Sequence, residues 1–301
     1  GRFVANSRWH FPFAIGFSRN TLPRTQPRES LITRTPTRRR FFDGEFGIKR
    51  NFNRLSLTLL GHYRDQELDD GRAINTGQPV IKSDANRNEY GATVRARYLL
   101  GGRNKKPEYN FFTTLTWNEQ DFDKRRFQNG GFNGRTNDRS EQIATLGFET
   151  RYKDLIYANL GAGLTRQNFE APGIETVNEL RFQGDLRASV TKKLDLKLNG
   201  ARAVNQESEL TSGSVNTRFG VGLDYEFHHD TYFESGLDYI DSDFIDQQRQ
   251  DEDIILRGSL KHYLNDNLTS ELSLKYRDRT SNLSGNAFQR TLLLLSITGR
   301  L

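Results

Sequence analysis

The 301-residue sequence contains no cysteine and no methionine. Without cysteine, a disulfide framework, thiolate catalysis and a thiolate metal site are all excluded. The aliphatic run Leu292–Leu295 is far shorter than the roughly 20 apolar residues that a transmembrane helix requires, so a helical membrane span is excluded as well. Because methionine is also missing at position 1, we expect the chain to begin after a processed or trimmed terminus, with no signal peptide left to read.

Hydrophobic residues are scarce for a chain of this length. They make up 34% of the sequence and charged residues 27%, and the mean hydropathy is −0.76. Such a composition does not supply a dry core of the expected size. Disorder is nevertheless contradicted by 21 Phe and 11 Tyr, because disordered chains contain few aromatic residues. The apolar residues must therefore be used efficiently.

Apolar and polar residues alternate in many segments, as in ELRFQGDLRASV at residues 179–190. One parity carries Leu180, Phe182, Leu186 and Val190, and the other carries arginine, glutamine, aspartate and serine. This period of two predicts β-strands with two chemically different faces, and segments of roughly ten residues can cross a bilayer when tilted. The predicted strands are residues 8–19, 38–51, 54–65, 88–100, 108–119, 141–152, 155–166, 178–190, 194–204, 216–227, 231–241, 253–263, 268–278 and 289–301.

Short and long connections alternate between these strands. The short turns are residues 50–53, 101–107, 152–154, 191–193, 228–230 and 264–267, and the long polar connections are residues 65–88, 119–140, 167–178, 204–215, 241–252 and 278–288. This alternation is typical of an up-and-down membrane barrel with short periplasmic turns and long external loops. The sequence therefore predicts an all-β fold, a transmembrane antiparallel β-barrel of about 14 strands (12–16), as a single domain over residues 1–301, with both termini on the short-turn side.

Aromatic residues lie near both ends of the predicted strands. Those beside short turns are Tyr98, Tyr109, Tyr152, Tyr157, Phe227, Tyr232 and Tyr263, and those toward the long connections are Tyr63, Trp117, Phe169 and Tyr239. Two such sets predict the aromatic girdles of a membrane barrel. The plainer interpretation is that aromatic residues are common in strands of every kind.

Three stretches carry a family resemblance: residues 222–239 (GLDYEFHHDTYFESGLDY), residues 267–290 (NLTSELSLKYRDRTSNLSGNAFQR) and residues 291–301 (TLLLLSITGRL). In spacing and composition they resemble the putative β-barrel porin (type 2-like) family of outer-membrane proteins. The resemblance implies a place in the outer membrane of a Gram-negative bacterium and an association with exopolysaccharide export. Leu301 departs from the aromatic residue with which barrels of this class commonly end.

One face of the predicted barrel is apolar and would contact lipid, whereas the charged face would line a wet lumen. A charged lining favours a porin-like channel for polar or anionic solutes, exopolysaccharide included, because arginine matches carboxylate and phosphate geometry. Alternatively, charges on neighbouring strands pair and close the lumen, which leaves a structural barrel that anchors a cell-envelope or surface assembly. The predicted lumen-lining residues are Arg95, Arg97, Arg151, Arg181, Asp185, Arg187, Lys197, Asp224, Glu226, Glu234, Asp238, Arg257, Lys261, Lys275 and Arg277.

Residues 19–40 form a strongly basic stretch with seven arginines and one glutamate. We predict that it forms the first external loop, where it binds lipopolysaccharide phosphates or an anionic surface polysaccharide by charge, or folds into the lumen. A solvated loop without a special role is the alternative. Nucleic acid is not predicted as a partner, because the surrounding pattern is that of a membrane protein. The basic loop residues are Arg24, Arg28, Arg34, Arg38, Arg39 and Arg40.

Catalytic and metal-binding patterns are weak. His228 and His229 form a pair in a predicted turn, without a third ligand at a defined spacing. Ser259 and His262 have opposite parity and would point to opposite faces of their strand, so they would not form a nucleophile–base pair. We therefore predict no catalytic residue, no metal and no cofactor. An outer-membrane hydrolase with an unrecognised site is a third hypothesis.

Overall fold

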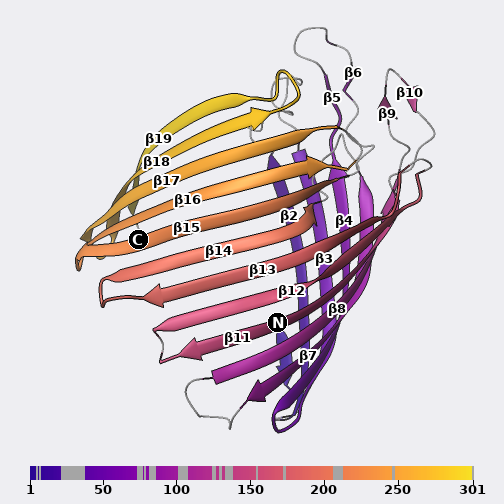
Figure 1. Cartoon of the computed structure of the whole chain (residues 1–301), viewed down its shortest axis with the longest axis horizontal. Coiled ribbons are helices and arrows are strands. Elements are labelled where there is room, and N and C mark those ends of the chain that lie inside the picture. Colours follow the sequence, from indigo (N-terminus) through magenta and orange to yellow (C-terminus); the bar gives the residue numbers. More distant parts are fainter. Residues whose placement is uncertain are drawn as a thin grey trace. The chain divides into compact units, whose positions relative to one another are not determined.

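The computed structural model describes residues 1–4, 6, 8–21, 38–72, 77, 79–80, 86–100, 108–123, 127–128, 131–132, 138–153, 155–171, 174–205, 213–245 and 248–299. Within these residues the regular elements are β-strands (Figure 1). No helix in this part of the chain is long and apolar enough to span a membrane.

The main sheet contains fifteen strands in chain order, β1-β2-β3-β4-β7-β8-β11-β12-β13-β14-β15-β16-β17-β18-β19, with hydrogen bonds between neighbours. The strands are β1 (Arg2–Val4), β2 (Trp9–Thr21), β3 (Arg38–Asn51), β4 (Leu55–Leu68), β7 (Arg87–Leu100), β8 (Glu108–Phe122), β11 (Arg139–Tyr152), β12 (Ile156–Phe169), β13 (Val177–Ser189), β14 (Leu194–Asn205), β15 (Ser214–His228), β16 (Thr231–Phe244), β17 (Gln250–Asn265), β18 (Leu268–Ser281) and β19 (Phe288–Gly299). The all-β, antiparallel up-and-down fold is thus confirmed, with the short β1 added to the strands that the sequence predicted.

Two of the long connections contain small hairpins of their own. β5 (Gly71–Arg72) pairs with β6 (Pro79–Val80), and β9 (Phe127–Gln128) pairs with β10 (Gly131–Phe132). Both hairpins form separate two-stranded sheets. The long connections between β4 and β7 and between β8 and β11 therefore contain short paired segments, which the alternation pattern did not predict.

Several strands extend by up to three residues beyond their predicted ends at the long connections. β4 ends at Leu68 and β16 at Phe244, whereas β17 already begins at Gln250. These extensions are rich in Asp, Glu and Gln, and their backbones continue the ladder, as the pairing of Asp243 with Gln250 shows. The predicted strands stopped where the apolar face stops, since roughly ten tilted residues cross the bilayer and strands of 12 to 16 residues extend beyond it.

The chain divides into two compact units, each of which has its own run of paired strands. The first comprises residues 1–98, 112–146 and 163–179, and the second comprises residues 99–111, 147–162 and 180–301. In the first unit, β2, β3, β4 and β7 are consecutive antiparallel neighbours. In the second unit, β13 to β19 are consecutive antiparallel neighbours. Figure 1 shows β14 to β19 side by side. The single-domain assignment stays a prediction.

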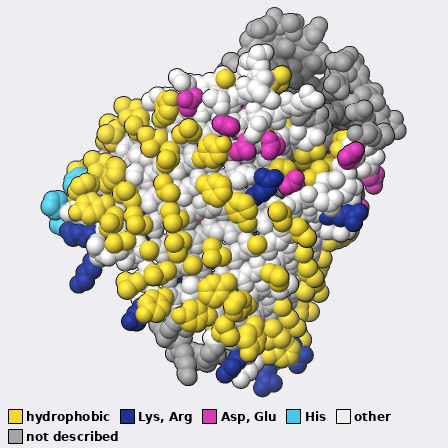
Figure 2. Space-filling view, in the orientation of Figure 1, with side chains coloured by type: hydrophobic (Ala, Val, Ile, Leu, Met, Phe, Trp, Pro, Cys, Tyr) yellow, Lys and Arg dark blue, Asp and Glu magenta, His cyan; other side chains and the backbone are white. Residues whose placement is uncertain are grey.

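One face of β13–β19 is apolar and exposed. Figure 2 shows hydrophobic side chains over the middle of these strands, with Lys and His at the short-turn end and Asp and Glu toward the long connections. An exposed apolar layer is what a lipid-facing wall requires, because lipid rather than protein covers it. Exposed hydrophobic residues of this face include Leu180, Leu196, Leu198, Phe219, Val221, Leu237, Ile254, Leu256, Leu260, Leu272, Leu274, Leu293, Leu295 and Ile297.

Aromatic residues gather on the apolar face of the first unit near the long connections. Tyr63 and Tyr90 are register partners, and their rings have aromatic neighbours in Phe42 (6.4 Å between centroids) and Trp117 (6.0 Å). This group fits the interfacial girdle predicted around Tyr63 and Trp117.

In the second unit, two of the predicted girdle residues lie on the other face. Tyr232 pairs with Lys261, and Tyr263 has the same parity as Lys261, so both rings share the charged face and contact each other edge-on at 5.7 Å. The girdle prediction is therefore wrong for Tyr232 and Tyr263. It used position along the strand alone, and an aromatic residue near a turn contacts lipid only when its parity is also that of the lipid face.

Candidate functional site: a charged hollow on β14–β19

Charged side chains of the second unit form rows that run across neighbouring strands. One row consists of the successive register partners Lys197, Gly222, Gly236, Arg257 and Lys275, from β14 to β18. Because neighbouring strands lie about 4.8 Å apart, the two glycines leave a gap of two strands between Lys197 and the other two cations. The row therefore has cations at both sides and no side chains in the middle.

The adjacent row toward the short turns is acidic. It consists of Asp195, Asp224, Glu234, Ser259 and Ser273, again as successive register partners. Asp224 and Glu234 are direct partners, so two carboxylates lie side by side. Like charges placed opposite each other destabilise a sheet unless cations compensate them, and the cationic row supplies that compensation.

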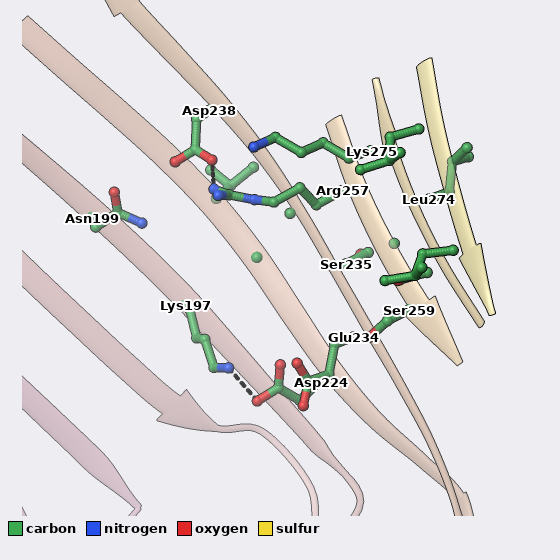
Figure 3. Close-up of a pocket in the computed structure, with 17 residues that line it drawn as sticks. Lys197, Asn199, Asp224, Glu234, Ser235, Asp238, Arg257, Ser259, Leu274 and Lys275 are labelled. Atoms are coloured by element: carbon green, nitrogen blue, oxygen red, sulfur yellow. Dashed lines mark ion pairs between the residues drawn. The ribbon is translucent and has the colours of Figure 1, made fainter. Parts of the chain in front are cut away.

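A hollow of about 430 Å³ lies over these rows (Figure 3). Gly222 and Gly236 form its floor, where the absence of side chains exposes the backbone. Leu292 and Leu294 of β19 lie at the far side, as the partners of Lys275 and Ser273. Its charged lining residues are Lys197, Asp224, Glu234, Asp238, Arg257 and Lys275.

Ion pairs hold several of these side chains in place. Lys197 pairs with Asp224, and Arg257 pairs with Asp238. Asp238 also accepts hydrogen bonds from Arg218 Nε (3.0 Å) and Nη2 (2.6 Å). The Asp238 side chain is only 3% exposed, whereas those of Arg218 and Arg257 are 44% and 46% exposed. Asp238 is thus a buried carboxylate between two half-exposed guanidinium groups.

Two charged residues that line the hollow take no part in these ion pairs. Within the described part of the chain, the side chains of Glu234 and Lys275 form no hydrogen bond or ion pair. Both residues are exposed. In Figure 3, Glu234 lies beside Asp224, and Lys275 points with Arg257 toward Asp238. The hollow therefore presents an unpaired carboxylate on one side and an unpaired ammonium group on the other.

A second ionic cluster lies at the long-connection ends of β17 and β18. Asp253 accepts two hydrogen bonds each from Arg277 (2.7 and 2.9 Å) and Arg279 (3.0 and 2.7 Å). Asp251 pairs with Arg249 and accepts a hydrogen bond from Ser281 at 2.6 Å. Both aspartates are 1% exposed. These ion pairs connect the two strands. Both carboxylates are buried and already bonded to arginine side chains, which argues against a binding role.

Most predicted lumen residues of the second unit share the charged face by register: Asp185, Arg187, Lys197, Asp224, Glu226, Glu234, Asp238, Arg257, Lys261, Lys275 and Arg277. The structure brings together Lys197 with Asp224 and Asp238 with Arg257. Arg187 pairs instead with Asp195, and Lys261 lies over the ring of Tyr263 at 5.3 Å. Arg181 and Arg151 lie on β13 and β11, outside the hollow.

In the first unit, Arg95 and Arg97 are register partners of Thr58 and Ser56. Arg95 lies over the ring of Phe112 at 4.7 Å. Whether all these residues line a water-filled lumen stays a prediction. The sequence did not single out Arg218, Asp253 or Arg279. Each has the same parity as a predicted lining residue on its own strand, so alternation could have assigned it to the charged face. Arg279, however, lies beyond the predicted strand end.

The basic loop prediction needs a correction. Arg24, Arg28 and Arg34 lie outside the described residues. Arg38, Arg39 and Arg40 are not in the loop but on β3, where they pair with Thr21, Asn20 and Arg19 of β2. The ladder extends to Arg38 because both strands continue beyond their apolar stretch. Arg40 also contacts Glu67 (3.1 Å) and Asp69 (3.4 Å), so part of its charge is compensated locally.

Ser259 and His262 do not form a nucleophile–base pair. Ser259 is a partner of Glu234 and His262 a partner of Thr231, which confirms that Ser259 and His262 lie on opposite faces. His262 Nδ1 is 2.9 Å from Thr231 Oγ1. The Thr231 hydroxyl donates to Asp230 at 3.1 Å, and this hydrogen bond lowers the pKa of the Asp230 carboxyl in the turn between β15 and β16. Among the described residues, no group of three His, Asp or Glu is arranged to hold a metal ion.

An up-and-down antiparallel sheet with one exposed apolar face and one charged face defines a β-barrel protein of the bacterial outer membrane. Comparison with known families agrees with this class. The chain belongs to the family described as Putative beta-barrel porin 2, whose sequence model matches residues 1–301. No curated protein matches the sequence.

Several solved structures of bacterial proteins have a similar fold. FpvA of Pseudomonas aeruginosa bound to heterologous pyoverdines is 10% identical, with a TM-score of 0.57 over 100% of this chain and 51% of that chain. The FrpB iron transporter of Neisseria meningitidis is 6% identical (TM-score 0.56; 93% and 50%). The ferric yersiniabactin uptake receptor FyuA of Yersinia pestis is 10% identical (TM-score 0.53; 97% and 54%). The chain spans about half the length of these proteins, and at such identities the likeness shows the fold alone.

Proposed function

We propose that this outer-membrane barrel is a channel for small polar solutes and that its role is transport rather than catalysis. The observation that supports this proposal most directly is the hollow on β14–β19. Its lining consists mainly of charged, serine and glycine residues, while the opposite face of the same strands is apolar. A wall built this way keeps lipid on one side and hydrated solutes on the other.

The second candidate is a plugged structural barrel. It is favoured by the ion pairs Arg187–Asp195, Lys197–Asp224 and Arg277–Asp253, which satisfy wall charges between strands rather than offering them to a solute. Such a barrel would anchor envelope-complex proteins in the membrane. Under this proposal the lumen carries no current.

Single-channel recording in planar lipid bilayers tests the two candidates. The channel proposal expects steady conductance, with an ion preference that shifts toward cations when Lys275 is replaced by Gln. Lys192→Gln, at the exposed turn between β13 and β14, is the matched control and should leave the preference unchanged. The absence of conductance from correctly folded, bilayer-inserted protein would reject the channel proposal and favour the structural barrel.

Two finer proposals concern surface partners. Passage of an acidic exopolysaccharide would appear as transient block of the current by oligosaccharide fragments that carry carboxylates, and not by neutral ones. Binding of lipopolysaccharide phosphates by Arg38 and Arg39, at the end of β3, would appear as co-purified lipopolysaccharide that the Arg38→Gln, Arg39→Gln double variant retains less of. If the double variant retains as much lipopolysaccharide, these two arginines have no such role.

A further inference from the structure

We infer that the hollow on β14–β19 binds a short zwitterionic molecule of the dipeptide class, with its ammonium end at the acidic row and its carboxylate end at the cationic side. This inference rests on the proposed channel function and names the kind of solute that the channel favours. It follows from the charge balance on each side of the glycine floor, from the distance between the two sides, and from the leucines beside one of them.

The acidic side has one negative charge in excess. Asp224 and Glu234 lie side by side as register partners, and Lys197 pairs with Asp224 alone. Glu234 is exposed and has no ionic partner within the described part of the chain. A carboxylate beside a second carboxylate favours a cation between them. An ammonium group of a solute supplies that cation with three hydrogen-bond donors.

The opposite side has positive charge in excess. Asp238 lies between Arg218 and Arg257 and compensates one of them. Lys275, the register partner of Arg257, adds a third cation without an ionic partner in the described residues. Three cations around one carboxylate leave two positive charges for a solute anion. A carboxylate entering here meets Lys275 and Arg257, which line the hollow, and Arg218 adds its positive charge from the other side of Asp238.

The distance between the acidic side and the cationic side of the hollow favours a solute of a particular length. Glu234 is on β16 and Lys275 on β18, two strands apart and two residues apart along the register. Strand spacing and rise then put their Cα atoms about 12 Å apart. A free amino acid carries both charges on one carbon, whereas a dipeptide separates them by a peptide unit. The longer molecule therefore fits better between charged side chains on non-adjacent strands, and a hollow of about 430 Å³ is large enough for it.

Leucines distinguish the two ends. Leu292 is the register partner of Lys275, and Leu294 is the partner of Ser273 on the same strand β18. Both leucines are therefore nearer to Lys275 than to Glu234 on β16. They are 44% and 54% exposed and therefore available for contact with an apolar group. The favoured solute thus carries its apolar side chain next to its carboxylate. Glycyl-L-leucine has this arrangement and is the probe of choice.

Isothermal titration calorimetry on the protein in lipid nanodiscs tests the inference. The probes are glycyl-L-leucine, N-acetylglycyl-L-leucine without the ammonium group, glycyl-L-leucinamide without the carboxylate, and D-glucuronate. Glycyl-L-leucine should bind at least about fivefold more tightly than either blocked form, since each lacks one partly exposed ion pair. Glucuronate should bind more weakly, because it brings no cation to Glu234.

Substitutions assign each end of the probe. Glu234→Gln should abolish the preference over the acetylated form, and Lys275→Gln should abolish the preference over the amide. The matched controls are Glu271→Gln and Lys261→Gln, which lie on the same charged face outside the hollow and should preserve both preferences. Equal binding of the blocked forms, tighter binding of glucuronate, or no binding to a conducting protein would overturn this inference alone. Absence of conductance would overturn the proposed channel itself.

Discussion

Asp238 on β16 and Arg257 on β17 form an ion pair in which the carboxylate is buried and the guanidinium group is half exposed. A carboxylate that loses its hydration needs compensating hydrogen bonds, and Arg218 on β15 supplies two of them. The pair therefore does more than balance charge on the wall. It connects three consecutive strands at the edge of the glycine floor and fixes the position of the cations there.

Replacement of Asp238 by Asn should destabilise the barrel more than replacement of Asp224 by Asn. The Asp238→Asn change would leave two arginines without their shared carboxylate, at a cost of about 1–3 kcal/mol, reduced by their solvent exposure. Asp224 is 28% exposed and serves one lysine that is 41% exposed, so its loss should cost less than about 1 kcal/mol. Urea unfolding in phospholipid vesicles measures both values. Equal losses would show that Asp238 has no special structural role.

A positive charge should be costly on the apolar face and tolerated on the charged one. Leu198 is exposed on the apolar face of β14 between the partners Leu186 and Val221, whereas the next residue, Asn199, lines the hollow. Leu198→Arg should destabilise the inserted protein by about 2–4 kcal/mol near the bilayer midplane. Asn199→Arg, which introduces the same charge one residue along, should cost less than about 1 kcal/mol. Similar costs in vesicle unfolding would contradict the assignment of the faces.

The sequence predicted the strands well because period-two alternation is a local property of each segment. It could also separate residues of opposite faces, as Ser259 and His262 show. What it could not predict is which charged residues meet, because ion pairs depend on the register between strands. Arg187 pairs with Asp195 across the turn from β13 to β14, whereas Asp238 pairs with Arg218 of the preceding strand.

The glycine floor illustrates the same limit. Gly222 and Gly236 come from different strands, and their alignment between Lys197 and Arg257 requires four strands in register. The sequence shows the glycines but not the space they create together. Likewise, Leu292 and Leu294 belong to an apolar run with both parities, so alternation gives no sign that one pair of leucines shares the charged face.

Filling the glycine floor should reduce conductance. A Cβ at Gly236 would meet Val221 O at 3.5 Å, an ordinary contact, so Gly236→Leu should fold and place its side chain in the hollow. Gly299 has the parity of the apolar face and lies outside the hollow, and a Cβ there meets nothing within 4 Å. Gly299→Leu is therefore the matched control. Single-channel conductance should fall for Gly236→Leu and stay at the original level for Gly299→Leu; unchanged conductance in both would place the current path elsewhere.

The turn between β15 and β16 should respond to acid through Asp230. The hydrogen bond from Thr231 lowers the pKa of this carboxyl below its ordinary value of 3.8. A lowered folded-state pKa means that the stabilisation is fully present above the unfolded pKa and is lost as the pH falls through the folded one. Thr231→Val should therefore raise the Asp230 pKa toward 3.8, while Thr231→Ser should keep it low. Carboxyl NMR titration in detergent micelles measures these values, and an identical pKa in the wild type and the valine variant would refute the role of the hydroxyl.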